Sequence, residues 1–153
     1  MSRAARLAQC MLLAALVCVA RGRALGAQTI SVVGNPAGMT VTDAVPGFEP
    51  APLSASTSYS ITTNQPNKIF KVTAQLNTNM PAGLTLTATM TVPSGATSTG
   101  TQSLSTTPAD LITGITRNTT FSGTITYQFV ATAAAGVVTA QTRGVTLTIM
   151  RTP

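Results

Sequence analysis

The chain lacks histidine and tryptophan altogether, and its only two cysteines, Cys10 and Cys18, lie near the N-terminus. Without histidine there is no Ser–His or Cys–His pair to activate a nucleophile, and no imidazole to bind a metal. Beyond residue 18 there is no thiol, which excludes thiolate zinc sites and disulfides from the rest of the chain. These absences predict a non-enzymatic protein with no cofactor and no metal site.

Carboxylates are scarce as well, because the chain has only Asp43, Glu49 and Asp110. A calcium site draws on more oxygen ligands than these supply. Asp43 and Glu49 could meet as the acid and base of a glycosidase, but the tryptophans that stack on sugars in such clefts are missing. Two lysines, Lys68 and Lys71, could serve a Ser–Lys pair or an internal Lys–Asn isopeptide bond assisted by Glu49, yet nothing in their spacing singles them out. The sequence therefore names no catalytic, cofactor-binding or metal-binding residue.

The formal net charge of +6 is concentrated at the N-terminus. Beyond residue 27 the chain keeps five basic and three acidic residues, which is a net charge of +2. The five positive charges are scattered, whereas a nucleic-acid interface gathers them on one surface. The basic residues before residue 27 are Arg3, Arg6, Arg21 and Arg23. We expect no nucleic-acid partner.

Residues 1–27 have the pattern of a secretory signal peptide. Arg3 and a second arginine precede an apolar run over residues 10–20, which is shorter than the ~20 residues that a membrane-spanning helix needs. Small residues before Ala27 predict cleavage between Gly26 and Gln28, with a cut after Ala20 as the alternative. The residues before the two cysteines do not fit a lipoprotein signal. We expect a secreted or cell-surface protein, periplasmic or extracellular, without a membrane span after cleavage.

Residues 28–153 are expected to form a single domain built of β-strands. The clearest strand covers residues 84–92, where apolar residues alternate with threonines. Turn residues flank it on both sides, as Pro81-Ala82-Gly83 and Pro93-Ser94-Gly95. The alternation predicts that Leu86 faces the core and that Thr87 faces solvent.

Other segments repeat this alternation or suggest a connection. A short helix is possible at residues 108–112, a turn at 131–138, and an exposed hairpin tip at 94–101. The further strands are expected at residues 70–76, 123–131 and 145–149, with weaker candidates at 29–33, 39–45, 58–62 and 103–106. Seven or eight short strands predict an all-β, antiparallel, immunoglobulin-like β-sandwich, although the paired cysteines and core tryptophan of immunoglobulins are absent. A jelly roll is the alternative.

Two local patterns allow a more specific function. Asn118-Thr119-Thr120 matches the acceptor for N-glycosylation. Threonine arrays on a sheet can also bind ice or a polysaccharide, but such proteins show a fixed repeat, and this chain has no constant period. The threonines are therefore interpreted as the solvent-facing residues of strands.

In pattern, the chain resembles small bacterial secreted surface proteins of the fimbrial-subunit and spore-coat kind. The likeness lies in the exported leader, the Thr-rich alternating strands and the closing segments 124–127 and 143–149. It implies assembly into fibres or coats, often by donation of a strand to a neighbour. The chain lacks the cysteine pair of chaperone-assembled pilins, and no functional residue is carried over.

Two functions remain open at this point. One is a structural component of a fibre, coat or surface layer; the other is a monomeric binding module for carbohydrate or a host surface. Scarce aromatic residues weaken the second, because sugar sites favour exposed rings. Lys68 and Lys71 are expected to protect one sheet edge, whereas the segments 29–33 and 145–149 carry no charge. Either segment, at an edge, would allow self-association or strand exchange with a partner subunit.

Overall fold

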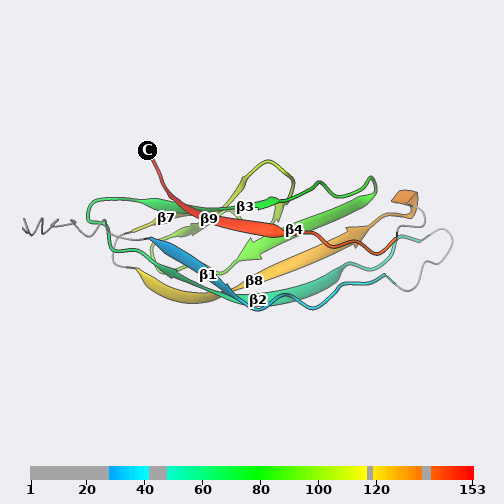
Figure 1. Cartoon of the computed structure of the whole chain (residues 1–153), viewed down its shortest axis with the longest axis horizontal. Coiled ribbons are helices and arrows are strands. Elements are labelled where there is room, and N and C mark those ends of the chain that lie inside the picture. Colours follow the sequence, from blue (N-terminus) through cyan, green and yellow to red (C-terminus); the bar gives the residue numbers. More distant parts are fainter. Residues whose placement is uncertain (1–27, 42–47, 117–118, 136–138) are drawn as a thin grey trace, which may run out of the picture.

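The computed structural model describes residues 28–41, 48–116, 119–135 and 139–153, which form two antiparallel β-sheets facing each other (Figure 1). Within these residues there is no α-helix, and one 3-10 turn, η1, covers Ala133–Ala135. The predicted all-β, antiparallel sandwich is therefore confirmed. The predicted leader at residues 1–27 lies outside the described residues.

One sheet has five strands in the order β1-β2-β8-β4-β6, and the other has four in the order β5-β7-β3-β9. From β2 onward, every strand lies in the sheet opposite to that of the strand before it. The five-stranded sheet comprises β1 (Thr29–Val33), β2 (Leu53–Thr62), β8 (Thr120–Ala131), β4 (Leu84–Met90) and β6 (Gln102–Ser103). The four-stranded sheet comprises β5 (Thr97–Ser98), β7 (Ala109–Ile115), β3 (Phe70–Leu76) and β9 (Val145–Arg151).

The core lies between the sheets and follows the predicted alternation. In β4, Leu86, Ala88 and Met90 are buried, while Thr87 is half-buried on the opposite face. In β2 the same period places Tyr59 in the core and serines on the outer face. Inward-facing residues of both sheets form one continuous apolar cluster. Burial of this cluster supplies the main stabilisation of a domain without disulfides.

The helix considered at residues 108–112 is wrong, because residues 109–112 belong to strand β7. The pairing of β7 with β3 shifts register around Val72. Leu111 and Ile112, adjacent in sequence, are consequently both buried. Gly114 follows with a φ of 72°, in the left-handed region. A bulge of this kind breaks the period of two, which is the signal that would have marked a strand.

Several predicted boundaries also change. Strands β1 and β3 have the predicted limits, whereas β2 and β8 begin earlier than predicted. Residues 39–41 are not in a strand, and the rest of the candidate at 39–45 lies outside the described residues. Strand β6 ends at Ser103, after which Leu104 turns into the core. The chain does turn after β8 through η1, and residues 136–138 lie outside the described part.

Candidate functional site

The two acidic side chains that the structure describes, Glu49 and Asp110, have separate partners. The carboxylate of Glu49 accepts a hydrogen bond from the backbone N–H of Ala133 at 2.7 Å, where it holds η1 against the loop before β2. Asp110 pairs instead with Lys71 on the neighbouring strand. Asp43 lies outside the described residues, as does Asn118. Among the described residues, no three Asp, Glu, His or Cys side chains come together to hold a metal.

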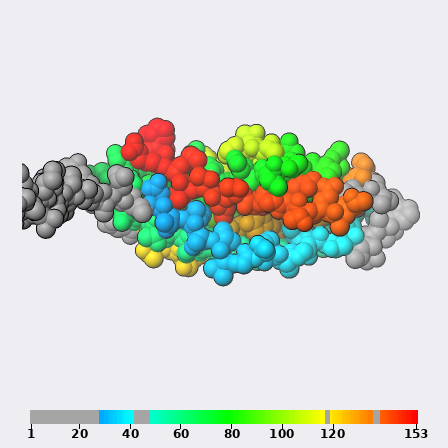
Figure 2. All heavy atoms as spheres, viewed as in Figure 1, coloured from blue at the N-terminus to red at the C-terminus, as the bar shows by residue number. Residues whose placement is uncertain are grey.

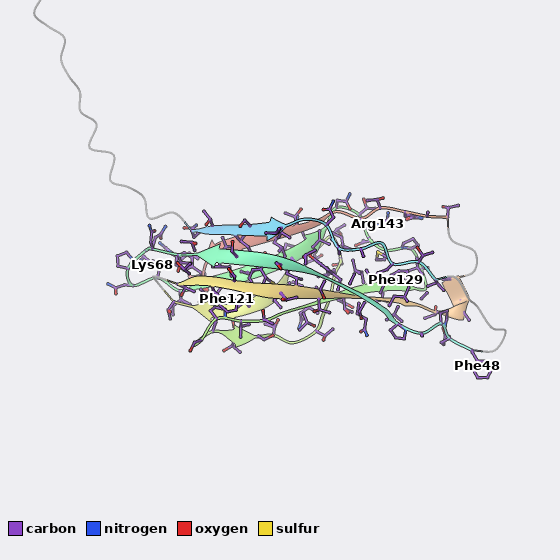
Figure 3. All side chains as sticks on the ribbon, turned by 90° about the horizontal axis from the view of Figure 1, so that it is seen from below. Phe48, Lys68, Phe121, Phe129 and Arg143 are labelled. Atoms are coloured by element: carbon purple, nitrogen blue, oxygen red, sulfur yellow. The ribbon has the colours of Figure 1, made fainter. Side chains whose placement is uncertain are left out.

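The lysines do not protect an edge, contrary to the prediction. Lys71 is on β3, which lies inside its sheet between β7 and β9. Its ammonium is 2.9 Å from the carboxylate of Asp110, and both side chains are partly exposed. Lys68 lies in the turn before β3, at the end of the sandwich opposite to Phe48 (Figure 3). Lys71 therefore forms a surface ion pair, and Lys68 is an exposed loop residue; neither lysine lies in a buried site.

One side of the sandwich is closed by the chain itself. The short strands β5 and β6 form edges of the two sheets, and the segment that joins them crosses from one sheet to the other. Leu104 is buried after this crossing, and its N–H donates to the carbonyl of Leu86 at 2.9 Å. The N–H of Thr99 donates to the carbonyl of Leu111 at 3.2 Å. Residues 94–101 are mostly exposed, as predicted, but they form β5 and the crossing between the sheets rather than a hairpin tip.

The opposite side, between β1 and β9, is open. These two strands are the remaining edges of the sheets, and they lie side by side on the face shown in Figure 2. Val32 of β1 pairs with Tyr59 of β2 and shares its inward face, but Val32 is 43% exposed and Tyr59 only 1%. On β9, Leu147 is half-buried, whereas its inward-facing partner Ala74 on β3 is buried. Among the described residues, no further strand covers the inward face at these two edges.

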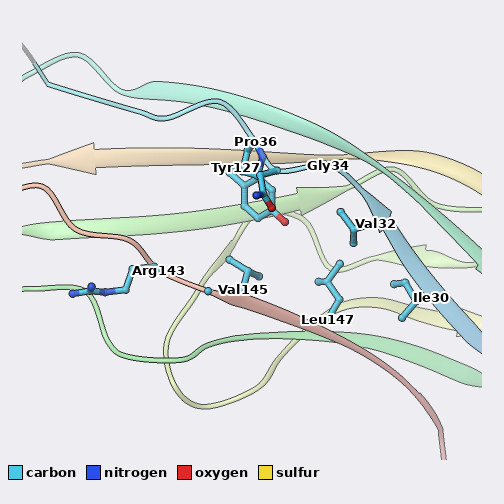
Figure 4. A pocket seen from close by; sticks show the side chains of 10 residues that line it. Ile30, Val32, Gly34, Pro36, Tyr127, Arg143, Val145 and Leu147 are labelled. Atoms are coloured by element: carbon cyan, nitrogen blue, oxygen red, sulfur yellow. The ribbon is translucent and has the colours of Figure 1, made fainter.

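A groove of about 410 Å³ runs along this open side (Figure 4). Its lining combines apolar side chains with polar groups, and the positive charge of Arg143 lies at one end. The side chains that define it are Ile30 and Val32 of β1, Pro36 of the loop that follows, Tyr127 of β8, and Val145 and Leu147 of β9.

Sequence reasoning identified the uncharged segments 29–33 and 145–149, which lie in β1 and β9, but not that they border a groove. Tyr127 was expected in β8, and its position at the groove could not be inferred from the alternation of that strand. Arg143 lies before β9, where its guanidinium donates a hydrogen bond to the carbonyl of Asn79 at 3.3 Å. No local signal in the sequence marks these residues, because strands from both sheets form the groove.

Both tyrosines have a raised pKa because they are buried. Burial raises the pKa of Tyr59 to about 12, and it also raises the pKa of Tyr127. The hydroxyl of Tyr59 donates a hydrogen bond to the carbonyl of Thr91, and its ring lies 6.1 Å from that of Phe121. Since removing a phenolic proton would leave a charge between the sheets, the folded state favours the protonated form.

We expect the free energy of unfolding to fall as pH rises from about 10 to about 12. In this window the unfolded chain releases phenolic protons that Tyr59 and Tyr127 retain when folded, so alkali favours unfolding. Urea titrations across this range measure the slope, and tyrosinate absorbance reports the ionisation itself. The Tyr59→Phe variant should show a smaller slope, with a loss of about 0.5–1.5 kcal/mol at neutral pH from its missing hydrogen bond. An unchanged slope in this variant would contradict the assignment.

Comparisons with protein-family models, with curated proteins and with solved structures found no match to this chain. In the part of the chain that the structure describes, no helix is long and apolar enough to cross a membrane.

Proposed function

We propose that the protein is a non-enzymatic, exported structural component that assembles into a fibre, coat or surface layer through its exposed sheet edges. The observation that carries this proposal is the open side of the sandwich, where β1 and β9 flank a groove lined partly by apolar side chains. Export follows from the signal-peptide pattern of residues 1–27. The resemblance to secreted surface proteins of the fimbrial-subunit and spore-coat kind points to the same class.

The edge strands have little that would prevent pairing with another chain. Proteins usually block such edges with charges, prolines or bulges. Strand β1 contains no charge and no proline, and β9 contains one charge, Arg151, at its last residue. The register of β9 along β3 is continuous from Val145 to Arg151, without a bulge. An added strand would therefore find a regular row of backbone donors and acceptors beside apolar side chains.

Self-association is tested by sedimentation velocity on the processed protein over a wide concentration range. We expect species larger than a monomer to increase with concentration. Ser31→Lys on β1 and Thr148→Lys on β9 should each be compared with Gln128→Lys, which places the same charge on the exposed face of the interior strand β8. At least one edge variant should weaken association, and the control should not. A wild-type chain that stays monomeric throughout would contradict the proposal.

A binding module for carbohydrate or a host surface is the second candidate, favoured by the outer face of the five-stranded sheet. Hydroxyls cover this face and bond across the strands, as in Ser31–Ser60 at 2.7 Å and Thr89–Thr101 at 2.9 Å. The aromatic side chains of β2 and β8 lie on the opposite, inward face. This candidate predicts a stable monomer that co-sediments with insoluble polysaccharides. A monomer that does not bind them would contradict it.

A further inference from the structure

We propose that β9 pairs with β9 of a second copy, antiparallel and centred on Thr148, so that the two four-stranded sheets join into one. This inference deepens the proposed function, on which it rests, because it names the edge, the partner and the register. Three features of β9 carry it: the direction of its free backbone groups, the order of its side chains, and the positions of its two neighbouring arginines.

The backbone hydrogen bonds at the two ends of β9 show which residues point toward the open side. The N–H of Thr152 donates to the carbonyl of Ile69 at 2.8 Å, and the N–H of Asn77 donates to the carbonyl of Gly144 at 2.9 Å. In an antiparallel pair, directly bonded residues alternate with residues whose backbone groups point away. Even-numbered residues of β9 therefore bond to β3. The odd-numbered residues Val145, Leu147 and Ile149 direct their N–H and C=O groups outward.

A second copy of β9 satisfies these groups when the pairing is centred on Thr148. Leu147 then lies opposite Ile149 of the other copy, and both are residues with outward-directed backbone groups. Inward-facing apolar side chains meet each other on one face, and Thr148 meets its own copy on the other. The strand is thus complementary to itself in both hydrogen bonding and side-chain character.

The two adjacent registers, centred on Leu147 and on Ile149, are less favourable because of like charges in one and a proline in the other. Centring on Leu147 would place Arg143 opposite Arg151 of the other copy, and like charges directly opposite each other are destabilising. Centring on Ile149 would place Val145 opposite Pro153, which has no N–H to donate. With the centre on Thr148, Arg151 lies opposite Val145. This arrangement keeps Arg143 of one copy away from Arg151 of the other. Each outward-directed N–H of β9, from Val145 to Arg151, then lies opposite a carbonyl of the second copy.

Antiparallel pairing centred on Thr148 relates the two copies by a two-fold axis. This axis turns the open sides of the two copies toward each other. Strand β1 and the groove lie on the side that β9 presents to the partner, so the partly exposed Val32 of each copy would face the other molecule. An interface that uses the same surface on both copies closes on itself. A closed dimer is therefore the expected assembly unit, joined through β9.

A charge-swap experiment tests the register, because position 148 of one copy lies opposite position 148 of the other. Thr148 is exposed on the outer face, so the domain should tolerate a charged residue there. Thr148→Lys and Thr148→Glu, each alone, should raise the dimer dissociation constant at least about tenfold. An equimolar mixture of the two should recover dimers close to the wild-type affinity, as heterodimers. Failure of the mixture to recover would overturn the inference, as would single variants that associate like wild type.

Cysteine cross-linking separates this inference from the proposed function. In the full chain carrying Cys10→Ser and Cys18→Ser, Thr148→Cys would be the only thiol. Non-bonded antiparallel pairs have Cα atoms about 4.5 Å apart, a spacing that disulfides span. We expect rapid disulfide dimers for Thr148→Cys under mild oxidation and few for the matched variant Ser31→Cys on β1. Cross-linking at Ser31 alone, with association intact, would overturn the β9 inference but leave edge assembly standing; no association and no cross-link would overturn both.

Discussion

Leu86→Ala should lower the free energy of unfolding by about 2–5 kcal/mol. Leu86 is 8% exposed, lies in the middle of β4, and belongs to the apolar cluster between the sheets. Truncating it removes buried methyl groups and leaves a cavity, because the surrounding strands are held in place by their hydrogen bonds. Urea unfolding followed by circular dichroism would measure the change.

The next residue provides the matched control. Thr87 lies on the outer face of β4, where its hydroxyl is 3.4 Å from the carbonyl of Gln128. Thr87→Ala should change stability by less than about 1 kcal/mol, since it removes one weak, partly solvated hydrogen bond. Equal losses at the two positions would mean that β4 does not present alternate faces to core and solvent.

Gly83→Ala should destabilise the domain by about 2–5 kcal/mol for two separate reasons. Gly83 has a φ of 76°, a conformation that residues with a Cβ adopt only with strain. A Cβ at this position would also lie 2.7 Å from the backbone nitrogen of Ala135 in η1. The carbonyl of Gly83 accepts the N–H of Thr132 at 2.8 Å, so the two segments are tied together and cannot easily separate. Thermal and urea unfolding would both report the loss.

Gly95→Ala separates the two causes. Gly95 has a similar φ of 83°, but a Cβ there would meet no atom within 4 Å. The cost at Gly95 should therefore be the conformational part alone, about 1–2 kcal/mol. If Gly83→Ala cost no more than Gly95→Ala, the close packing of η1 against the start of β4 would be contradicted.

Much of the fold can be predicted from the sequence because alternation is a local signal. In β4, the threonines between apolar residues identify both the strand and its buried face before any partner is known. The same signal gives the limits of β3 and β1. It fails at β7, where a bulge buries Leu111 and Ile112 together and leaves a pattern that also fits a helical turn.

The candidate site depends on pairing between distant strands, which local patterns do not encode. The alternation around Lys71 identifies a strand but not its neighbours, and the lysine was therefore assigned to an edge when it lies inside a sheet. The absence of charge from residues 145–149 of β9 was visible in the sequence. Its position across the groove from β1 follows only from the complete strand order.

The alternation of the chain between the two sheets has a consequence for how the protein folds. Among the described strands, β1 and β2 are the only consecutive pair that are hydrogen-bonded to each other. The other neighbour of β2 is β8, and the neighbours of β3 are β7 and β9, which all come much later in the chain. Each of these pairings closes a long loop before it gains any contact, which slows folding to the range of milliseconds to seconds. A chain with this topology forms little stable structure until its last strands are present. For the exported protein proposed above, slow folding would leave the chain extended long enough to cross a membrane before the sandwich closes.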